Sequence, residues 1–128
     1  MSYTQEWTNE GVYINFFDEL TSRDLVESNS ILVGKREFEE IKYVIINFND
    51  VTNVEIDDRD VNANTAFAER VNPYNKHIKV ALVSNNATLK PLLENYINGT
   101  SAILPHAQQE IFSNVTEAKT WISSEQTN

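Results

Sequence analysis

The stretch Lys42-Tyr-Val-Ile-Ile-Asn-Phe48 decides the fold of this sequence, because it is apolar and β-branched almost throughout. Such a run favours a strand inside a sheet that is covered on at least one face. Val80-Ala-Leu-Val83, within His77–Ser84, predicts a second buried strand. Two such strands with a helix-length segment between them are typical of parallel strands joined by a crossover helix.

Working outward, Tyr3–Thr8 and Val12–Asp18 alternate between apolar and polar residues, and Asn9-Glu10-Gly11 between them has the composition of a turn. This pattern predicts an N-terminal β-hairpin. A last strand is predicted over Gln108–Phe112.

Four helices are predicted from their start and stop signals. Thr21 and Asp24 have capping-box spacing, and the helix they open runs to about Val33, where Gly34 supplies the stop. A second helix is predicted to begin at Asp57 as N-cap and to end at Asn72-Pro73. A third has Asn85 or Asn86 as N-cap, Pro91 in its first turn and Gly99 as its stop. The fourth is a short helix with Thr116 as N-cap, and it packs Ala118, Trp121 and Ile122. The order β-β-α-β-α-β-α-β-α predicts a single α/β domain over residues 1–122, followed by a frayed polar tail over residues 123–128.

Composition narrows the class of protein. The chain has 128 residues, a length that suits one domain. Its net charge of −9 disfavours binding to nucleic acid, and its lack of cysteine excludes disulfides and thiolate chemistry. The first residues lack a signal-peptide pattern, and no apolar run has the length of a membrane span. We therefore expect a cytoplasmic protein without a membrane span.

No stretch carries a known catalytic motif, so we expect neither an enzyme nor a cofactor. An enzyme would need His77 or His106 to meet a carboxylate in a cleft. The segment 58–69 has acidic or amide residues at EF-hand spacing, but Ala63 occupies the position that needs glycine. We therefore expect no metal site.

Polar residues follow the two central strands. They are Asn47, Asn49, Asp50, Thr52, Ser84, Asn85 and Asn86. Ligands of such sheets bind beyond the carboxyl ends of the strands, and a helix N-terminus there would present free amides. Binding of a partner or ligand is accordingly predicted at Asn49, Asp50, Thr52, Ser84 and Asn85, together with Asp57 and Asp58. Ordinary turn chemistry is the alternative explanation of the same residues.

Three segments carry a family resemblance: Gly11-Val-Tyr-Ile-Asn-Phe16, Tyr43-Val-Ile-Ile-Asn-Phe-Asn-Asp-Val-Thr52, and Phe112-Ser-Asn-Val-Thr-Glu-Ala-Lys-Thr-Trp-Ile122. They resemble small SpoIIAA-like proteins of the STAS-like group, which share their fold with anti-sigma-factor antagonists and are related to CRAL-TRIO lipid carriers. The resemblance implies a mixed sheet of four to five strands with helices mainly on one face.

The resemblance also implies where regulation would act. In the antagonists a kinase phosphorylates a serine in an Asp-Ser-Ser/Thr-Gly turn that opens a helix. Asp57 matches the aspartate of this turn, but Asp58, Arg59 and Asp60 stand at the following positions. The phosphorylatable serine is therefore expected to be absent, with Asp58 as a fixed negative charge.

Together these observations predict a non-enzymatic regulatory or protein-interaction module. Its partner would be a protein docking on the Asn49–Asp60 edge, or a second copy of the chain. A homodimer is expected to form across an uncovered sheet face, whose solvent-facing patch contains some of Tyr3, Trp7, Tyr13 and Phe17. Self-association is assigned to Trp7, Tyr13 and Phe17. The alternative is a domain that binds a small molecule or a lipid in an enclosed apolar pocket.

Overall fold

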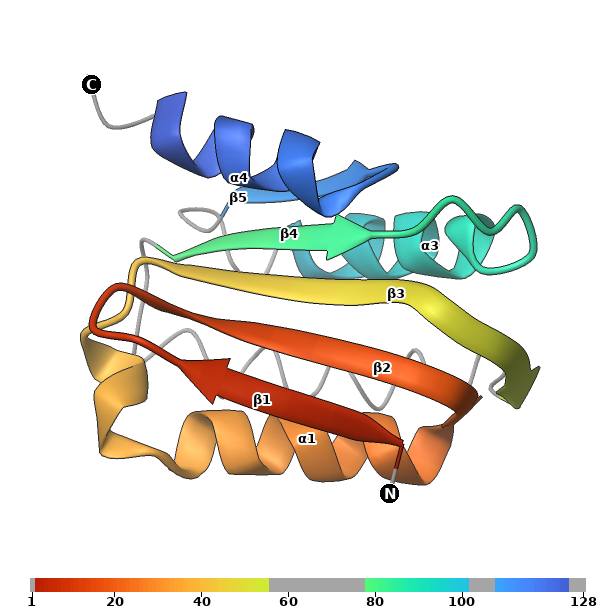
Figure 1. The fold of residues 1–128 in the computed structure, drawn as a ribbon, viewed down its shortest axis with the longest axis horizontal. Helices are drawn as coiled ribbons and strands as arrows, with labels where there is room; N and C mark the ends of the chain where they lie inside the picture. The colour runs from red at the N-terminus through yellow and green to blue at the C-terminus, as the bar shows by residue number, and fades with distance from the viewer. Residues whose placement is uncertain (1, 56–77, 102–107, 125–128) are drawn as a thin grey trace.

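Five strands form one mixed sheet in the order β1-β2-β3-β4-β5 in the computed structural model, which describes residues 2–55, 78–101 and 108–124 (Figure 1). The strands are β1 (Tyr3–Trp7), β2 (Gly11–Thr21), β3 (Tyr43–Glu55), β4 (Lys79–Val83) and β5 (Gln108–Phe112). β1 runs antiparallel to β2, and β2 to β5 are parallel to one another. The predicted hairpin, the two central strands and the last strand are thereby confirmed.

Three helices and a short 3₁₀ helix complete the described part of the chain. They are α1 (Ser22–Gly34), η1 (Arg36–Glu39), α3 (Lys90–Ser101) and α4 (Val115–Ser124). α4 thus extends two residues into the predicted polar tail, and η1 was not predicted. The helix predicted to begin at Asp57 lies outside the described residues.

Helix starts follow the predicted chemistry more closely than helix ends. Thr21 Oγ1 accepts a hydrogen bond from Asp24 N at 3.2 Å, which confirms the cap of α1. Gly34 is the last residue of α1 but has no positive φ, and the helix closes through Lys35 N, which donates to Leu32 O at 3.5 Å. Gly99 lies inside α3, so the predicted stop there was wrong.

The predicted cap of α4 was also wrong. Asn114 Oδ1 accepts from Glu117 N at 2.9 Å, so Asn114 caps the helix two residues before Thr116. Asparagine is a better N-cap than threonine, and its side chain reaches the amide three residues later. The helix nevertheless buries Ala118 and Ile122 as expected.

The larger core lies between the sheet and the two helices α1 and α3. Alternate residues of β2 and β3 supply it, and Phe16 stacks on Phe48 with ring centroids 5.4 Å apart. Leu32 of α1 and Leu93 of α3 cover these strands. This arrangement agrees with the expected sheet that carries helices mainly on one face.

The smaller core lies on the opposite face of the sheet, under α4. The residues that alternate with the larger core, Ile45 of β3 and Ala81 of β4, pack here against Ala118 and Ile122. Because β3 and β4 are buried on both faces, their continuous apolar sequence is explained.

Candidate functional site

One amide side chain of β3 joins the carboxyl ends of β4 and β5. Asn49 Oδ1 accepts a hydrogen bond from Asn85 N at 2.8 Å, and Asn49 Nδ2 donates to Ser113 O at 2.9 Å. Asn85 follows β4 and Ser113 follows β5. The prediction that Asn49 and Asn85 meet at one edge is therefore confirmed, whereas Ser113 was not among the predicted residues.

A second amide extends this network across the sheet. Asn47 is only 7% exposed, and its Nδ2 donates to Asn15 Oδ1 at 2.8 Å and to the Tyr13 hydroxyl at 3.1 Å. Its Oδ1 accepts from Asn49 N at 3.1 Å. We call Tyr13, Asn15, Asn47 and Asn49 the amide row. Every buried side-chain polar atom in the described ranges has a hydrogen-bond partner, so no buried polar atom of the row is left unpaired.

Backbone N–H groups in the loop before α3 also donate hydrogen bonds to nearby side chains. Ser84, which is buried, accepts from Asn86 N through its Oγ at 3.1 Å. Asn86 Oδ1 then accepts from Thr88 N at 2.8 Å and from Leu89 N at 3.3 Å. We expected free amides in a crevice at this point. That expectation was wrong, because these amides already hydrogen-bond to the side chain of Asn86.

Beyond this network, β2 and β3 continue together as a two-stranded ribbon. Their pairing shifts register after Asn15↔Asn47 and resumes at Phe17↔Asp50, then runs to Thr21↔Glu55 with a second shift after Asp18. We call the residues 17–21 and 50–55 the acidic ribbon. Its exposed carboxylates are those of Asp18, Glu19, Asp50 and Glu55, and it contains no lysine or arginine.

Of the predicted binding residues in this region, two lie on the acidic ribbon and two lie outside the described residues. Asp50 and Thr52 are exposed on the ribbon, and Thr52 Oγ1 donates to Asp18 O at 3.2 Å. Asp18 has φ of 57°, a left-handed conformation that aspartate tolerates better than most residues. Asp57 and Asp58 lie outside the described residues, so their place at this edge stays a prediction.

The residues predicted for self-association do not share one face. Tyr3 and Trp7 pack against the larger core, and the Tyr3 hydroxyl donates to Glu27 Oε1 at 2.7 Å. Tyr3 is buried, and Lys35 Nζ lies 5.4 Å from the ring centroid of Trp7. A common exposed face for Trp7, Tyr13 and Phe17 is therefore wrong. Tyr13 and Phe17 alternate with core residues of β2 and are half-exposed on the face under α4, where self-association stays a prediction.

Burial shifts the pKa of two side chains. Burial and the nearby carboxylate of Glu27 raise the pKa of Tyr3 to about 12. Burial lowers the pKa of Lys79, whose Nζ donates to Ile122 O at 3.4 Å and lies 5.4 Å from the ring centroid of Trp121. Lys79 thus fixes the last turn of α4 to the sheet.

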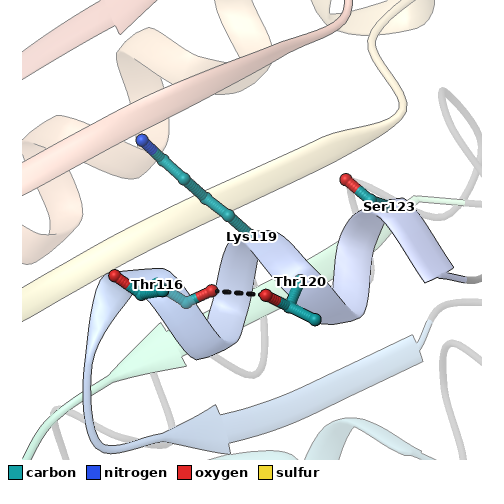
Figure 2. Close-up of a pocket in the computed structure, with 4 residues that line it drawn as sticks. All are labelled: Thr116, Lys119, Thr120 and Ser123. Carbon is teal, nitrogen blue, oxygen red and sulfur yellow. Dashed lines mark hydrogen bonds between the residues drawn. The ribbon is translucent and has the colours of Figure 1, made fainter.

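A hollow of about 510 Å³ lies beside α4. Its described lining consists of Thr116, Lys119, Thr120 and Ser123, all exposed, and Figure 2 shows Thr120 bonded back to the carbonyl of Thr116. A lipid site needs an enclosed apolar wall, which these four residues do not provide. Neither a group of three potential metal-ligating side chains nor a helix suited to crossing a membrane is present in the described ranges.

The arrangement of strands and helices defines an α/β domain with a SpoIIAA-like fold. The chain is similar to the structure of the anti-sigma factor antagonist SpoIIAA in its unphosphorylated form, with a TM-score of 0.60 and 14% identity over 97% of this chain and 99% of that one. It is similar to the Bacillus cell fate determinant SpoIIAA in the phosphorylated form, with a TM-score of 0.59 and 16% identity over 94% and 99% of the two chains.

A third similar structure has no stated function. It is an uncharacterised protein of the DUF3478 family with a SpoIIAA-like fold from Shewanella loihica PV-4, with a TM-score of 0.55 and 10% identity over 94% of this chain and 92% of that one. No protein-family model matches the sequence, and no curated protein matches it significantly. These comparisons confirm the predicted fold and, at such low identity, concern the fold alone.

Proposed function

We propose that this chain is a non-enzymatic regulatory module that acts by binding another protein. The observation that carries the proposal is the similarity to an anti-sigma factor antagonist over nearly the whole of both chains. The alignment covers 97% of this chain and 99% of that one, so the likeness concerns the whole fold and not a fragment of it. Binding through its surface is therefore the function that the fold favours most.

The hydrogen bonds at the carboxyl edge support binding over catalysis. Asn49 and Asn86 use their side chains to hold the loops after β4 and β5 in place. Asp50 and Asn85 remain exposed on this frame, where they can contact a partner. A rigid frame lowers the entropy that binding costs, because the contact residues are already in position.

We also propose that binding here is not controlled by phosphorylation of a serine after β3. SpoIIAA has been solved in a phosphorylated form. By the sequence resemblance described above, Asp57-Asp-Arg-Asp60 corresponds to the phosphorylated turn of the antagonists. Asp58 carries a constant negative charge that is smaller than that of a phosphate group.

Site-specific photo-crosslinking in the source cells tests the proposal. A photoreactive amino acid would replace Asp50 or Asn85 at the carboxyl edge. The control position is the exposed Glu37 on η1, which precedes the amino end of β3. We expect one protein to be joined to the first two positions and not to the third. Adducts that are equal at all three positions, or absent from both edge positions of a folded chain, would contradict the proposal.

A further inference from the structure

Among the residues that the structure describes, no strand lies beside the outer edge of β3 along the acidic ribbon. β4 pairs with β3 only from Tyr43↔Lys79 to Asn47↔Val83, whereas β2 accompanies β3 to Glu55. Within residues 2–55, 78–101 and 108–124, β2 is thus the only strand that pairs with β3 beyond Asn47. Backbone N–H and C=O groups along such an edge are a template for one more strand.

The side chains beside this edge determine which strand it can accept. Asp50, Thr52, Asn53 and Glu55 are all exposed, and Val51 and Val54 anchor the same stretch to the larger core. The ribbon carries acidic side chains on both of its strands and no basic one. A strand with lysine or arginine at alternate positions complements this charge, because alternate residues of a strand lie on one face.

The same charge argues against a second copy of this chain as the occupant. Pairing two ribbons edge to edge would bring Asp50 and Glu55 of each chain close to the like charges of the other. Like charges opposite one another destabilise strand pairs. The charge therefore favours a different protein over a second copy as the partner of this edge.

We infer that β3 binds a basic, extended segment of a partner protein as an added strand along Asp50–Glu55. This inference rests on the proposed function, since it names the surface through which the module would bind. The amide row holds the base of the ribbon: Asn49 fixes β3 to the loops after β4 and β5 directly before the open edge begins. Strand addition of this kind takes its affinity from main-chain hydrogen bonds and its specificity from alternate side chains.

Binding of a model peptide to the complete 128-residue chain tests the inference. The probe is acetyl-Lys-Thr-Lys-Val-Lys-Thr-amide, compared with a peptide in which glutamate replaces each lysine and with a lysine peptide that is N-methylated at alternate residues. The readouts are amide hydrogen exchange and chemical shifts of the protein. We expect the lysine peptide to slow exchange within residues 50–55, and the other two peptides to have no such effect.

A charge-matched pair of variants separates strand addition from general attraction to an acidic protein. Asp50→Lys/Glu55→Lys is expected to weaken binding of the lysine peptide about tenfold or more. Glu37→Lys/Glu94→Lys makes the same change in net charge at exposed positions on η1 and α3 instead of on the ribbon, and is expected to leave binding within about twofold.

Three results would overturn the inference: no slowing of exchange in residues 50–55 at a millimolar excess of the lysine peptide, equal binding of the N-methylated peptide, or equal loss in both charge variants. The crosslinking experiment distinguishes this failure from failure of the proposed function. A partner captured at Asn85 while the peptide fails at β3 would leave the module function intact and place the contact elsewhere.

Discussion

The two faces of the sheet are buried by different means. Under α1 and α3, aromatic and aliphatic side chains fill the space, and the rings of Tyr3, Phe16 and Phe48 contact one another in sequence. Under α4 the apolar cluster is smaller and adjoins the amide row. The comparison indicates that the first face determines stability, whereas the second determines how the strand ends and loops are positioned.

Removal of one large side chain from each face should show the greatest difference. Phe16→Ala is expected to reduce the free energy of unfolding by about 3–5 kcal/mol, because the residue is 2% exposed and packed between two rings. Ile122→Ala in the smaller core should cost about 2 kcal/mol, because the residue lies at the rim of α4 and is 8% exposed. Urea unfolding monitored by circular dichroism measures both values. Equal losses would break the distinction between the two faces.

The sequence predicts the buried apolar parts of the sheet better than its polar parts. The apolar residues of β3 and β4 identify buried strands without reference to tertiary structure. The second half of β3 was missed, since Asn49, Asp50 and Thr52 have the composition of a turn, and only pairing with β2 keeps them extended. A tertiary contact of this kind leaves no local periodicity.

The candidate site could also be predicted only in part, because its hydrogen bonds depend on tertiary contacts. Parallel strands necessarily bring their carboxyl ends to one edge, so the meeting of Asn49 with the loop after β4 could be predicted. The role of these residues could not, because the choice between binding a ligand and closing a loop depends on distances. Ser113 contributes its backbone carbonyl, which no side-chain pattern marks.

Gly11 offers a test of packing on the α4 side of the sheet. A Cβ atom at this position would overlap the ring of Tyr43, which lies across the glycine. Gly11→Ala should therefore reduce the free energy of unfolding by about 1–3 kcal/mol. In a double-mutant cycle, Tyr43→Ala should remove most of this cost, because the added methyl group then has space. Additive losses would contradict the packing explanation.

The hydrogen bond from Tyr3 to Glu27 lies at the polar boundary of the larger core, and its contribution to stability should depend on pH. Tyr3→Phe removes the hydrogen bond to Glu27, and the expected loss near neutral pH is about 1.5 kcal/mol because the acceptor is charged. The folded-state pKa of Tyr3 is raised from 10.0 to about 12, so the stabilisation is complete below pH 10 and is lost as the pH rises toward 12. Thermal unfolding of both proteins should give a constant difference from pH 7 to 9 that shrinks between pH 10 and 12. A difference that grows in that range would contradict the raised pKa.

The smallest expected effect concerns Asn49, where the role of the second face in positioning loops can be measured directly. Asn49→Asp keeps the acceptor for Asn85 N but replaces the donor to Ser113 O with an oxygen, so one of two hydrogen bonds is lost. The residue is half-buried, and the expected loss in free energy of unfolding is about 1 kcal/mol. Amide exchange should accelerate in the turn before α4, which Ser113 opens, while the amide of Asn85 should stay protected. Asn53→Asp is the matched control, since within the described residues Asn53 Nδ2 donates to Glu19 Oε2 on the exposed ribbon and not to a loop. Unchanged amide exchange before α4 in both variants would mean that Asn49 does not position that loop. The smaller face of the sheet would then not determine where the loops after the strands lie.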